Sequence, residues 1–124
     1  MGDLFFNCKS LISLNLSSFD TSLVTSKRCM FKNFTSLLSI DLSSFRTSSL
    51  QRMDLIFEFD ESLISLDLSN FYIYNISTMA GAFSGCKSLI FLNLNSFREI
   101  VNYADISLLF SNIPYTLIFL YDYG

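Results

Sequence analysis

A thirteen-residue pattern returns four times along this chain at a constant distance. The segments SLISLNLSSFDTS, SLLSIDLSSFRTS, SLISLDLSNFYIY and SLIFLNLNSFREI begin at Ser10, Ser36, Ser62 and Ser88, so each step is 26 residues. A fixed period of this size is typical of proteins in which every repeat forms one structural unit. A single unit cannot bury its own apolar face, and the units must therefore stack to fold.

Each repeat contains the pattern L-x-x-L-x-L-x-x-F, which is the strand pattern of leucine-rich repeats with Phe near its end. In the first repeat, Leu14 and Leu16 alternate with Ser13, Asn15 and Ser17, as expected of a strand with one buried face. Two columns of phenylalanine keep the same step, and we expect each to form a continuous buried spine: Phe5, Phe31, Phe57, Phe83; and Phe19, Phe45, Phe71, Phe97.

The segments between the strands predict short helices. Residues 25–34 and 77–86 open with Thr25 and Ser77, and hydroxyl residues commonly cap a helix. The predicted fold class is therefore an α/β solenoid with a parallel β-ladder on one face and helices of one to two turns on the other. We expect a single repeat domain over residues 1–124, a fragment of a longer array, with units at about 4–29, 30–55, 56–81, 82–108 and a partial unit at 109–124.

Composition excludes several classes of partner. Only 15% of the residues are charged, the net charge is −3, and the eight Lys and Arg residues are scattered. Because nucleic-acid binders usually carry a basic patch, we expect no nucleic-acid partner. No apolar run approaches the roughly 20 residues of a membrane span, so none is expected. The first ten residues lack the features of a signal peptide, which leaves a cytoplasmic location open.

The residues that usually carry enzymatic chemistry are scarce. The chain contains no His, which is the commonest general base and metal ligand, and it contains no phosphate- or dinucleotide-binding motif. We therefore expect no catalytic residue, no metal and no cofactor. Of the three cysteines, Cys8 and Cys86 lie three repeats apart, about 14 Å, which is too far for a disulfide. A Cys8–Cys29 bond stays open, although three small buried thiols are the preferred interpretation.

The outward-facing strand positions are the candidate binding residues. They are short and polar with one aromatic exception, and the face that they form is expected to be concave: Ser13, Asn15, Ser17, Ser39, Asp41, Ser43, Ser65, Asp67, Ser69, Phe91, Asn93 and Asn95. Repeat proteins use such faces for binding. Asp41 and Asp67 share a column and suggest a cation site, but a ladder of solvated side chains with Asn15 and Asn93 is the preferred interpretation.

The repeats resemble a known family. Met30–Met53 (MFKNFTSLLSIDLSSFRTSSLQRM) and Ala82–Leu89 (AFSGCKSL) resemble the units of BspA-like leucine-rich-repeat surface proteins. The resemblance covers about residues 4–97. It departs from the family pattern at Phe34 and Asp60, where the family has Cys, and in the last two repeats, where the Asp-Thr-Ser turn is lost. It implies a non-catalytic protein, exposed on the cell surface or outside the cell, that adheres to host or matrix proteins.

Two functions follow as expectations. The first is a leucine-rich-repeat module for protein–protein contact, in particular surface adhesion, as part of a longer protein. The second is a structural spacer or a degenerate array fragment without a ligand of its own. No capping repeat is visible at either end, so self-association through the open ends is a further expectation.

Overall fold

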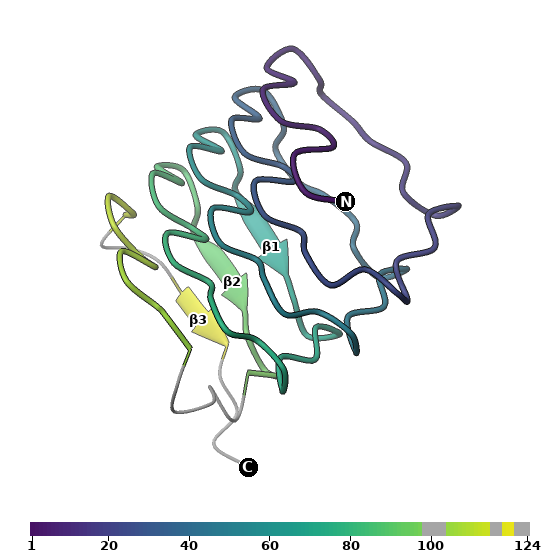
Figure 1. Ribbon diagram of the computed structural model, residues 1–124. Coiled ribbons are helices and arrows are strands. Elements are labelled where there is room, and N and C mark those ends of the chain that lie inside the picture. The colour runs from purple at the N-terminus through teal and green to yellow at the C-terminus, as the bar shows by residue number, and fades with distance from the viewer. Residues whose placement is uncertain (98–103, 115–117, 121–124) are drawn as a thin grey trace.

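The computed structural model describes residues 1–97, 104–114 and 118–120, and shows successive segments of the chain wound into parallel coils that stack side by side (Figure 1). We number the coils 1 (residues 1–26), 2 (27–52), 3 (53–78), 4 (79–97) and 5 (105–114 and 118–120). Single parallel bridges join Ser26 to Arg52, Arg52 to Thr78, and Thr78 to Asp105 at the coil boundaries. The last bridge spans 27 residues, so one additional residue lies between coils 4 and 5.

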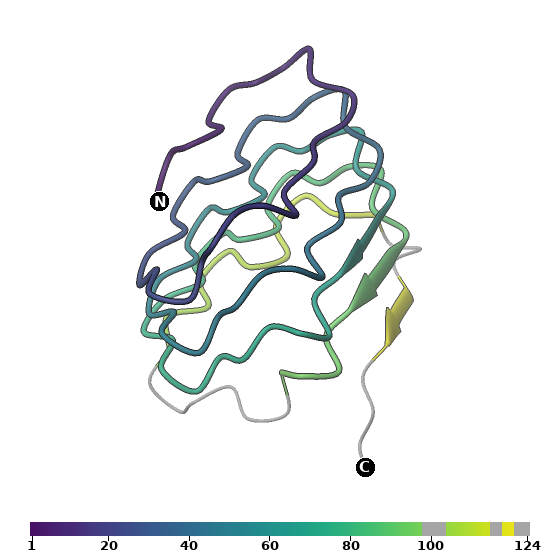
Figure 2. The ribbon, with the colours of Figure 1, turned by 90° about the vertical axis from the view of Figure 1, so that its right-hand side faces the viewer.

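Three short strands lie on one side of the stack (Figures 1 and 2). They are β1 (Ser65–Asp67), β2 (Phe91–Asn93) and β3 (Ile118–Leu120), and they form one parallel sheet in the order β1-β2-β3. Leu66 pairs with Leu92, one repeat apart, as the column of leucines predicts. The equivalent segments of coils 1 and 2, residues 13–17 and 39–43, contain no strand, so the expected ladder across all four repeats is wrong there.

The predicted α/β class is also wrong, because none of the described residues is helical. Residues 25–34 and 77–86 form consecutive turns instead of helices. In coil 2 the turns place Cys29 at φ +52° and Asn33 at φ +73°, and in coil 4 they place Gly81 and Gly85 at φ +61° and +75°. A right-handed helix requires negative φ throughout, so two left-handed residues four positions apart exclude it.

The hydrogen bonds of these turn segments explain what replaces the helix. Even-numbered amides close turns within a coil, as Met30 N–H does on Lys27 O (3.1 Å). Odd-numbered amides cross to the next coil, as Cys29 N–H does to Asp54 O (3.1 Å) and Phe31 N–H to Ile56 O (3.0 Å). A helix uses its amides internally and would leave neighbouring coils without these bonds. We call these segments, residues 1–8, 27–34, 53–60, 79–86 and 105–112, the turn side.

The spacing of the coils gives a second reason for the absence of helices. Equivalent Phe rings on the turn side stack with centroids 5.4 to 6.1 Å apart, whereas an α-helix with its side chains is about 10–12 Å across. The Phe45 and Phe71 rings, beyond the strand positions, lie 6.4 Å apart. Because the coils are similarly spaced on both sides, no helix layer opens one side into a convex face, and we call the other side the strand face rather than a concave face.

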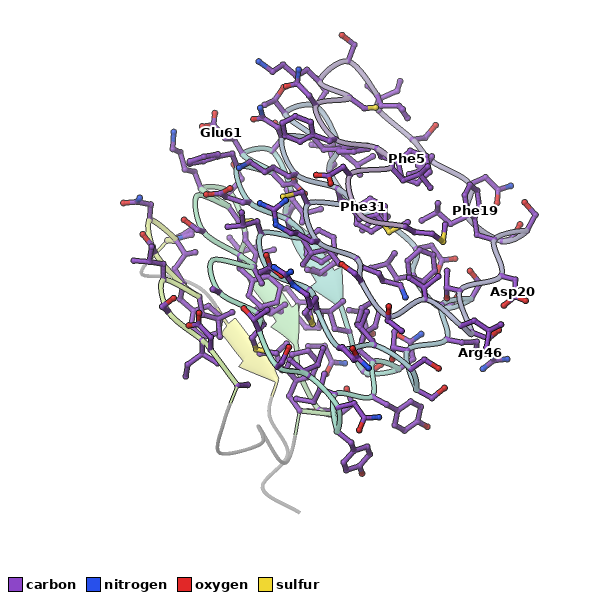
Figure 3. The ribbon with its side chains drawn as sticks, viewed as in Figure 1. Phe5, Phe19, Asp20, Phe31, Arg46 and Glu61 are labelled. Atoms are coloured by element: carbon purple, nitrogen blue, oxygen red, sulfur yellow. The ribbon has the colours of Figure 1, made fainter. Side chains whose placement is uncertain are left out.

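The two phenylalanine columns lie in the core, as predicted, except at coil 1, where Phe5 and Phe19 are only partly buried. Phe31, Phe57 and Phe83 are fully buried and stack nearly parallel, with interplanar angles of 12° and 8°. Phe5 extends this column at the first coil, where its ring lies over Phe31 (Figure 3). The leucine columns pack beside them, and Leu16, Leu42 and Leu68 are at most 2% exposed. Among the residues that the structure describes, no helix is long and apolar enough to cross a membrane.

Candidate functional site

The candidate binding residues lie together on the strand face. Their side chains are exposed in coils 1 and 2 and become half-buried in coil 4, where Phe91, Asn93 and Asn95 lie. The leucines between them point inward, so the alternation predicted from the sequence is present in all four coils, with or without an assigned strand. The structure therefore brings the predicted residues onto one surface.

A row of Asp and Asn residues crosses this surface: Asn15, Asp41, Asp67 and Asn93. Each side-chain Oδ1 accepts a hydrogen bond from the backbone amide two residues later, at 2.8 to 3.1 Å. These are Asx turns, in which the side chain ends the extended segment by mimicking a backbone turn. We call the four residues the Asx row.

The Asx bonds also set the charge of the surface. Hydrogen bonds from the Ser43 hydroxyl and amide stabilise the Asp41 carboxylate and lower its pKa below the usual value. Asp41 is therefore ionised at neutral pH and exposed to solvent. The Asx row was predicted to be a ladder of solvated side chains. Its side chains are also structural, because their hydrogen bonds end the extended segments.

Two hollows open between neighbouring coils along the Asx row. One, of about 380 Å³, lies between coils 1 and 2 and is lined by Asn15, Ser17, Asp41, Ser43 and Ser44 together with two leucines. The other, of about 170 Å³, lies between coils 2 and 3, with Asp41 and Asp67 on its wall. Each hollow therefore has at least one carboxylate among short polar side chains.

The cation site suggested by Asp41 and Asp67 has no further support. A stable site for a divalent cation usually needs more than two protein oxygen ligands in close geometry. Within residues 1–97, 104–114 and 118–120, no group of three or more His, Cys, Asp or Glu side chains could hold a metal ion.

A second polar row was missed by the sequence analysis. Ser44 Oγ donates to Leu16 O (3.2 Å) and Ser96 Oγ donates to Leu68 O (2.9 Å), each reaching back to the preceding coil. Asn70 occupies the same column and donates to Leu42 O at 2.9 Å. The sequence signal was a hydroxyl or amide residue at this position in every repeat. It was not recognised because such residues are common throughout the chain.

Two buried ionisable residues on the turn side were also missed. Lys27 is 0% exposed, and its Nζ has no hydrogen-bond partner within the described structure, although it lies 5.4 Å from the centroid of the Phe45 ring. Asp60 is 1% exposed, and its Oδ1 accepts from Phe34 N–H (2.8 Å). Burial lowers the pKa of Lys27 to about 8 and raises that of Asp60 to about 9.

The sequence signal for both residues is their departure from the repeat. Lys27 stands in a column with Met53 and Met79, and Asp60 stands in one with Phe34 and Cys86. Neither side chain reaches the surface, so neither is available to a ligand without rearrangement of the stack.

The cysteines form no disulfide. Cys8, Cys29 and Cys86 are free thiols, which removes the Cys8–Cys29 bond that the sequence left open. Cys29 and Cys86 are buried, and Cys8 is partly buried against the core. Burial raises the pKa of the Cys86 thiol, whose Sγ donates to Phe57 O (3.1 Å), so it is not a reactive thiolate.

Comparison with known proteins identifies a family. A family model described as "Mycoplasma protein of unknown function, DUF285" matches residues 1–115. No curated protein and no solved structure matches the chain.

Proposed function

The chain belongs to the DUF285 family, and from that premise we propose that it is a non-catalytic binding module of the BspA-like leucine-rich-repeat type. Its function is protein–protein contact through the strand face. As part of a longer protein on the cell surface, it would adhere to host or extracellular-matrix proteins. The family description assigns no function, so the proposal rests on the repeat resemblance and on the chemistry of this face.

The observation that carries the proposal is the Asx row with its two hollows. Asp41 and Asp67 carry negative charges that are exposed to solvent. The hollows beside them can receive a side chain of a partner. Exposed charge rows of this kind favour association with a complementary partner and set its rate and salt dependence.

A structural spacer is the second candidate, and one observation favours it. All four Asx side chains bond to their own backbone, so the row has a structural use that needs no ligand. Under this alternative, the same types of residue recur on the strand face of each coil only because each coil must turn at the same place.

The two candidates are separated by removing charge while keeping the turns. In the double variant Asp41→Asn, Asp67→Asn, each amide can still accept the Asx bond, as Asn15 and Asn93 already do. The matched control is Asp20→Asn, Asp105→Asn, which removes the same charge from two other exposed Asx turns. Asp20 lies beyond the strand face at the edge of coil 1, opposite the position of Arg46 in coil 2 (Figure 3).

Binding to a panel of immobilised extracellular-matrix proteins is the measurement. The binding module predicts saturable binding to at least one of them, reduced several-fold by the strand-face pair and unchanged by the control pair. Equal binding by both double variants, or no binding by the parent protein, contradicts the proposal and favours the spacer.

A further inference from the structure

An apolar ridge runs across the stack next to the Asx row. Ile12, Leu38, Ile64 and Ile90 occupy one column, and they are 77, 56, 40 and 48% exposed. A single exposed aliphatic residue needs no explanation, but a continuous row of four across neighbouring coils is a feature of interaction surfaces.

The stacking of the coils does not require these side chains. Between coils 2 and 3 and between coils 3 and 4, the contact at this column is made by the backbone, since Ile64 N–H donates to Leu38 O and Ile90 N–H donates to Ile64 O, both at 2.9 Å. Any residue other than proline can supply these amides and carbonyls. The large aliphatic side chains of Leu38, Ile64 and Ile90 are therefore a property of the surface and not of the fold. Ile12, which is the most exposed of the four, continues the row at coil 1.

The charge beside the ridge selects the kind of partner. Asp41 and Asp67 follow Leu38 and Ile64 by three residues, which in extended chain is about 10 Å. A second copy of this chain, with its net charge of −3, would place like charges against this row. A partner that covers both rows must therefore be apolar along one line and basic along a neighbouring line.

The repeat distance selects the partner's conformation. Neighbouring strands lie about 4.8 Å apart, one helical turn rises 5.4 Å, and a β-strand repeats its side chains on one face every 6.6 Å or so. Equivalent Phe rings of neighbouring coils lie 5.4 to 6.4 Å apart. The rise of one helical turn therefore falls within the range of spacings between the coils, whereas the strand repeat exceeds that range. A helix about 10–12 Å across is also wide enough to cover the ridge and the Asx row together.

The geometry points to a docking site for an amphipathic helix of a partner protein, with one aliphatic residue per turn on the ridge and Arg or Lys on the flank facing Asp41 and Asp67. This inference rests on the proposed function and names the partner's chemistry. The hollow between coils 2 and 3 receives a basic head group, because both carboxylates are on its wall. Phe91, which replaces the Ser of the other three coils, adds apolar contact at the coil-4 end.

The test uses three synthetic peptides of about 15 residues and the complete chain. The first peptide is a stapled helix with Leu once per turn and Arg on one flank. The second carries Glu in place of Arg, and the third has the composition of the first but alternates Leu and Arg, as a strand would. Fluorescence anisotropy at low and high salt gives the Kd of each complex.

The inference predicts that the basic helix binds at least tenfold more tightly than the acidic helix and the alternating peptide, and that high salt weakens it. Leu38→Ser, Ile64→Ser should lower its affinity at least tenfold, whereas Leu23→Ser, Tyr74→Ser, at exposed positions off the ridge, should leave it within twofold. Asp41→Asn, Asp67→Asn should lower the affinity several-fold and remove most of the salt dependence, and Asp20→Asn, Asp105→Asn should not.

Several outcomes overturn the inference. They are equal binding of the basic and acidic helices, tighter binding of the alternating peptide, absence of binding by the basic helix, and full affinity in the ridge variant. Replacing Leu by Ser in the peptide tests the ridge even if the protein variants unfold. If the matrix-protein experiment succeeds while the basic helix fails to bind, the proposed function stands and only the helical partner is rejected.

Discussion

The turn side and the strand face connect the same coils by different means. On the turn side, backbone amides cross from coil to coil at every second residue, as the Cys29, Phe31 and Asn33 amides do at 2.9 to 3.1 Å. On the strand face, the sheet is limited to β1, β2 and β3, and much of the remaining connection is made by small side chains such as Ser44 and Asn70.

This contrast shows which parts of the fold are most constrained. The turn side contains the left-handed residues, the stacked Phe column and the buried Lys27 and Asp60, so a substitution there meets backbone strain or buried charge. The strand face is held by local bonds that several short residues can make. Substitutions on the turn side should therefore destabilise the protein. The strand face should tolerate substitutions, including those that adapt it to a partner.

The largest expected effect is the dependence of stability on pH that originates from Asp60. Its pKa is about 9 in the folded protein and near 3.8 when exposed, so the folded state binds the additional proton between these values. The free energy of unfolding should therefore be highest below pH 4 with respect to this group, and should fall by several kcal/mol as the pH rises to 9. Urea unfolding at pH 5 and pH 8.5 measures the slope.

Asp60→Asn should remove most of that slope, because the amide has no proton to lose. The control Asp20→Asn, at an exposed Asx turn, should leave the slope between pH 5 and pH 8.5 in place. Parallel curves for the parent protein and Asp60→Asn would contradict the buried position of this carboxyl group.

The next effect is that of a side chain at Gly85. A Cβ there would lie 2.4 Å from Phe59 Cδ1, and the backbone is at φ +75°. Gly85→Ala should lower the free energy of unfolding by about 2–3 kcal/mol, as backbone strain and crowding add. On the strand face, the exposed Ser69→Ala should change it by less than about 0.5 kcal/mol. Equal effects of the two substitutions would remove the contrast between the two sides.

Lys27→Met should stabilise the protein. Methionine occupies this column at Met53 and Met79, and it has no charge to desolvate. The folded pKa of Lys27 is about 8 against 10.5 when exposed, so at pH 7 the gain should be of order 2–3 kcal/mol. The gain should shrink from pH 8 to 10.5, where the unfolded parent protein binds more protons than the folded one.

Thermal unfolding of Lys27→Met across this pH range makes the measurement, with the exposed Lys9→Met as control. A destabilised Lys27→Met protein would show that the ammonium group has a partner that offsets its burial.

A smaller effect is expected from Asn70 on the strand face. Its Nδ2 donates to Leu42 O at 2.9 Å, and Asn70→Ala should cost about 1 kcal/mol for the lost hydrogen bond. Asn70→Ser should recover most of it, because Ser44 and Ser96 make the equivalent bond in the same column. Equal stability of the Ala and Ser variants in denaturant unfolding would contradict the conclusion that this column stabilises the contact between neighbouring coils.

The smallest effect is expected at Asp41. Asp41→Asn keeps the Asx acceptor and should change the free energy of unfolding by less than about 0.5 kcal/mol. Asp41→Ala loses the acceptor for Ser43 N–H and should cost more. A large loss with Asn would mean that the charge itself stabilises the strand face, which would weaken its assignment to binding.

The repeat period was sufficient to predict the core and the surface. The stacked Phe column, the buried leucines and the outward alternation of the strand face all follow from which residues recur at a step of 26. Each of these depends on burial, and the hydrophobic pattern of a sequence reports burial directly.

The turn side was wrongly predicted to be helical because hydroxyl residues were interpreted as helix caps. The recurring residues that favour positive φ were overlooked. Asn7, Asn33 and Gly85 recur at one position of the repeat, and Asn and Gly are the residues that tolerate positive φ most readily. Leu55 and Phe59 also adopt positive φ, which no local rule predicts. There the crossing hydrogen bonds of the stack impose the conformation, so it depends on neighbouring coils and not on local sequence.

The surface that carries the candidate site was predicted from the alternation of the strand segments, but its hydrogen bonds were not. The outward position of the strand-face residues was predicted correctly, and their role in binding stays a prediction. The bonds of Ser44, Asn70 and Ser96 were not predicted, because they depend on which atoms meet between coils. Side-chain bonds to a backbone 28 residues away leave no motif other than repetition itself.

Amide hydrogen exchange within coil 2 tests the contrast between the two sides most directly. The Cys29, Phe31 and Asn33 amides, which donate to coil 3, should exchange much more slowly than the Ser39 and Asp41 amides of the strand face, where coil 2 contains no strand. Exchange at similar rates on both sides, or faster exchange on the turn side, would contradict the assignment of the fold's rigidity to the turns.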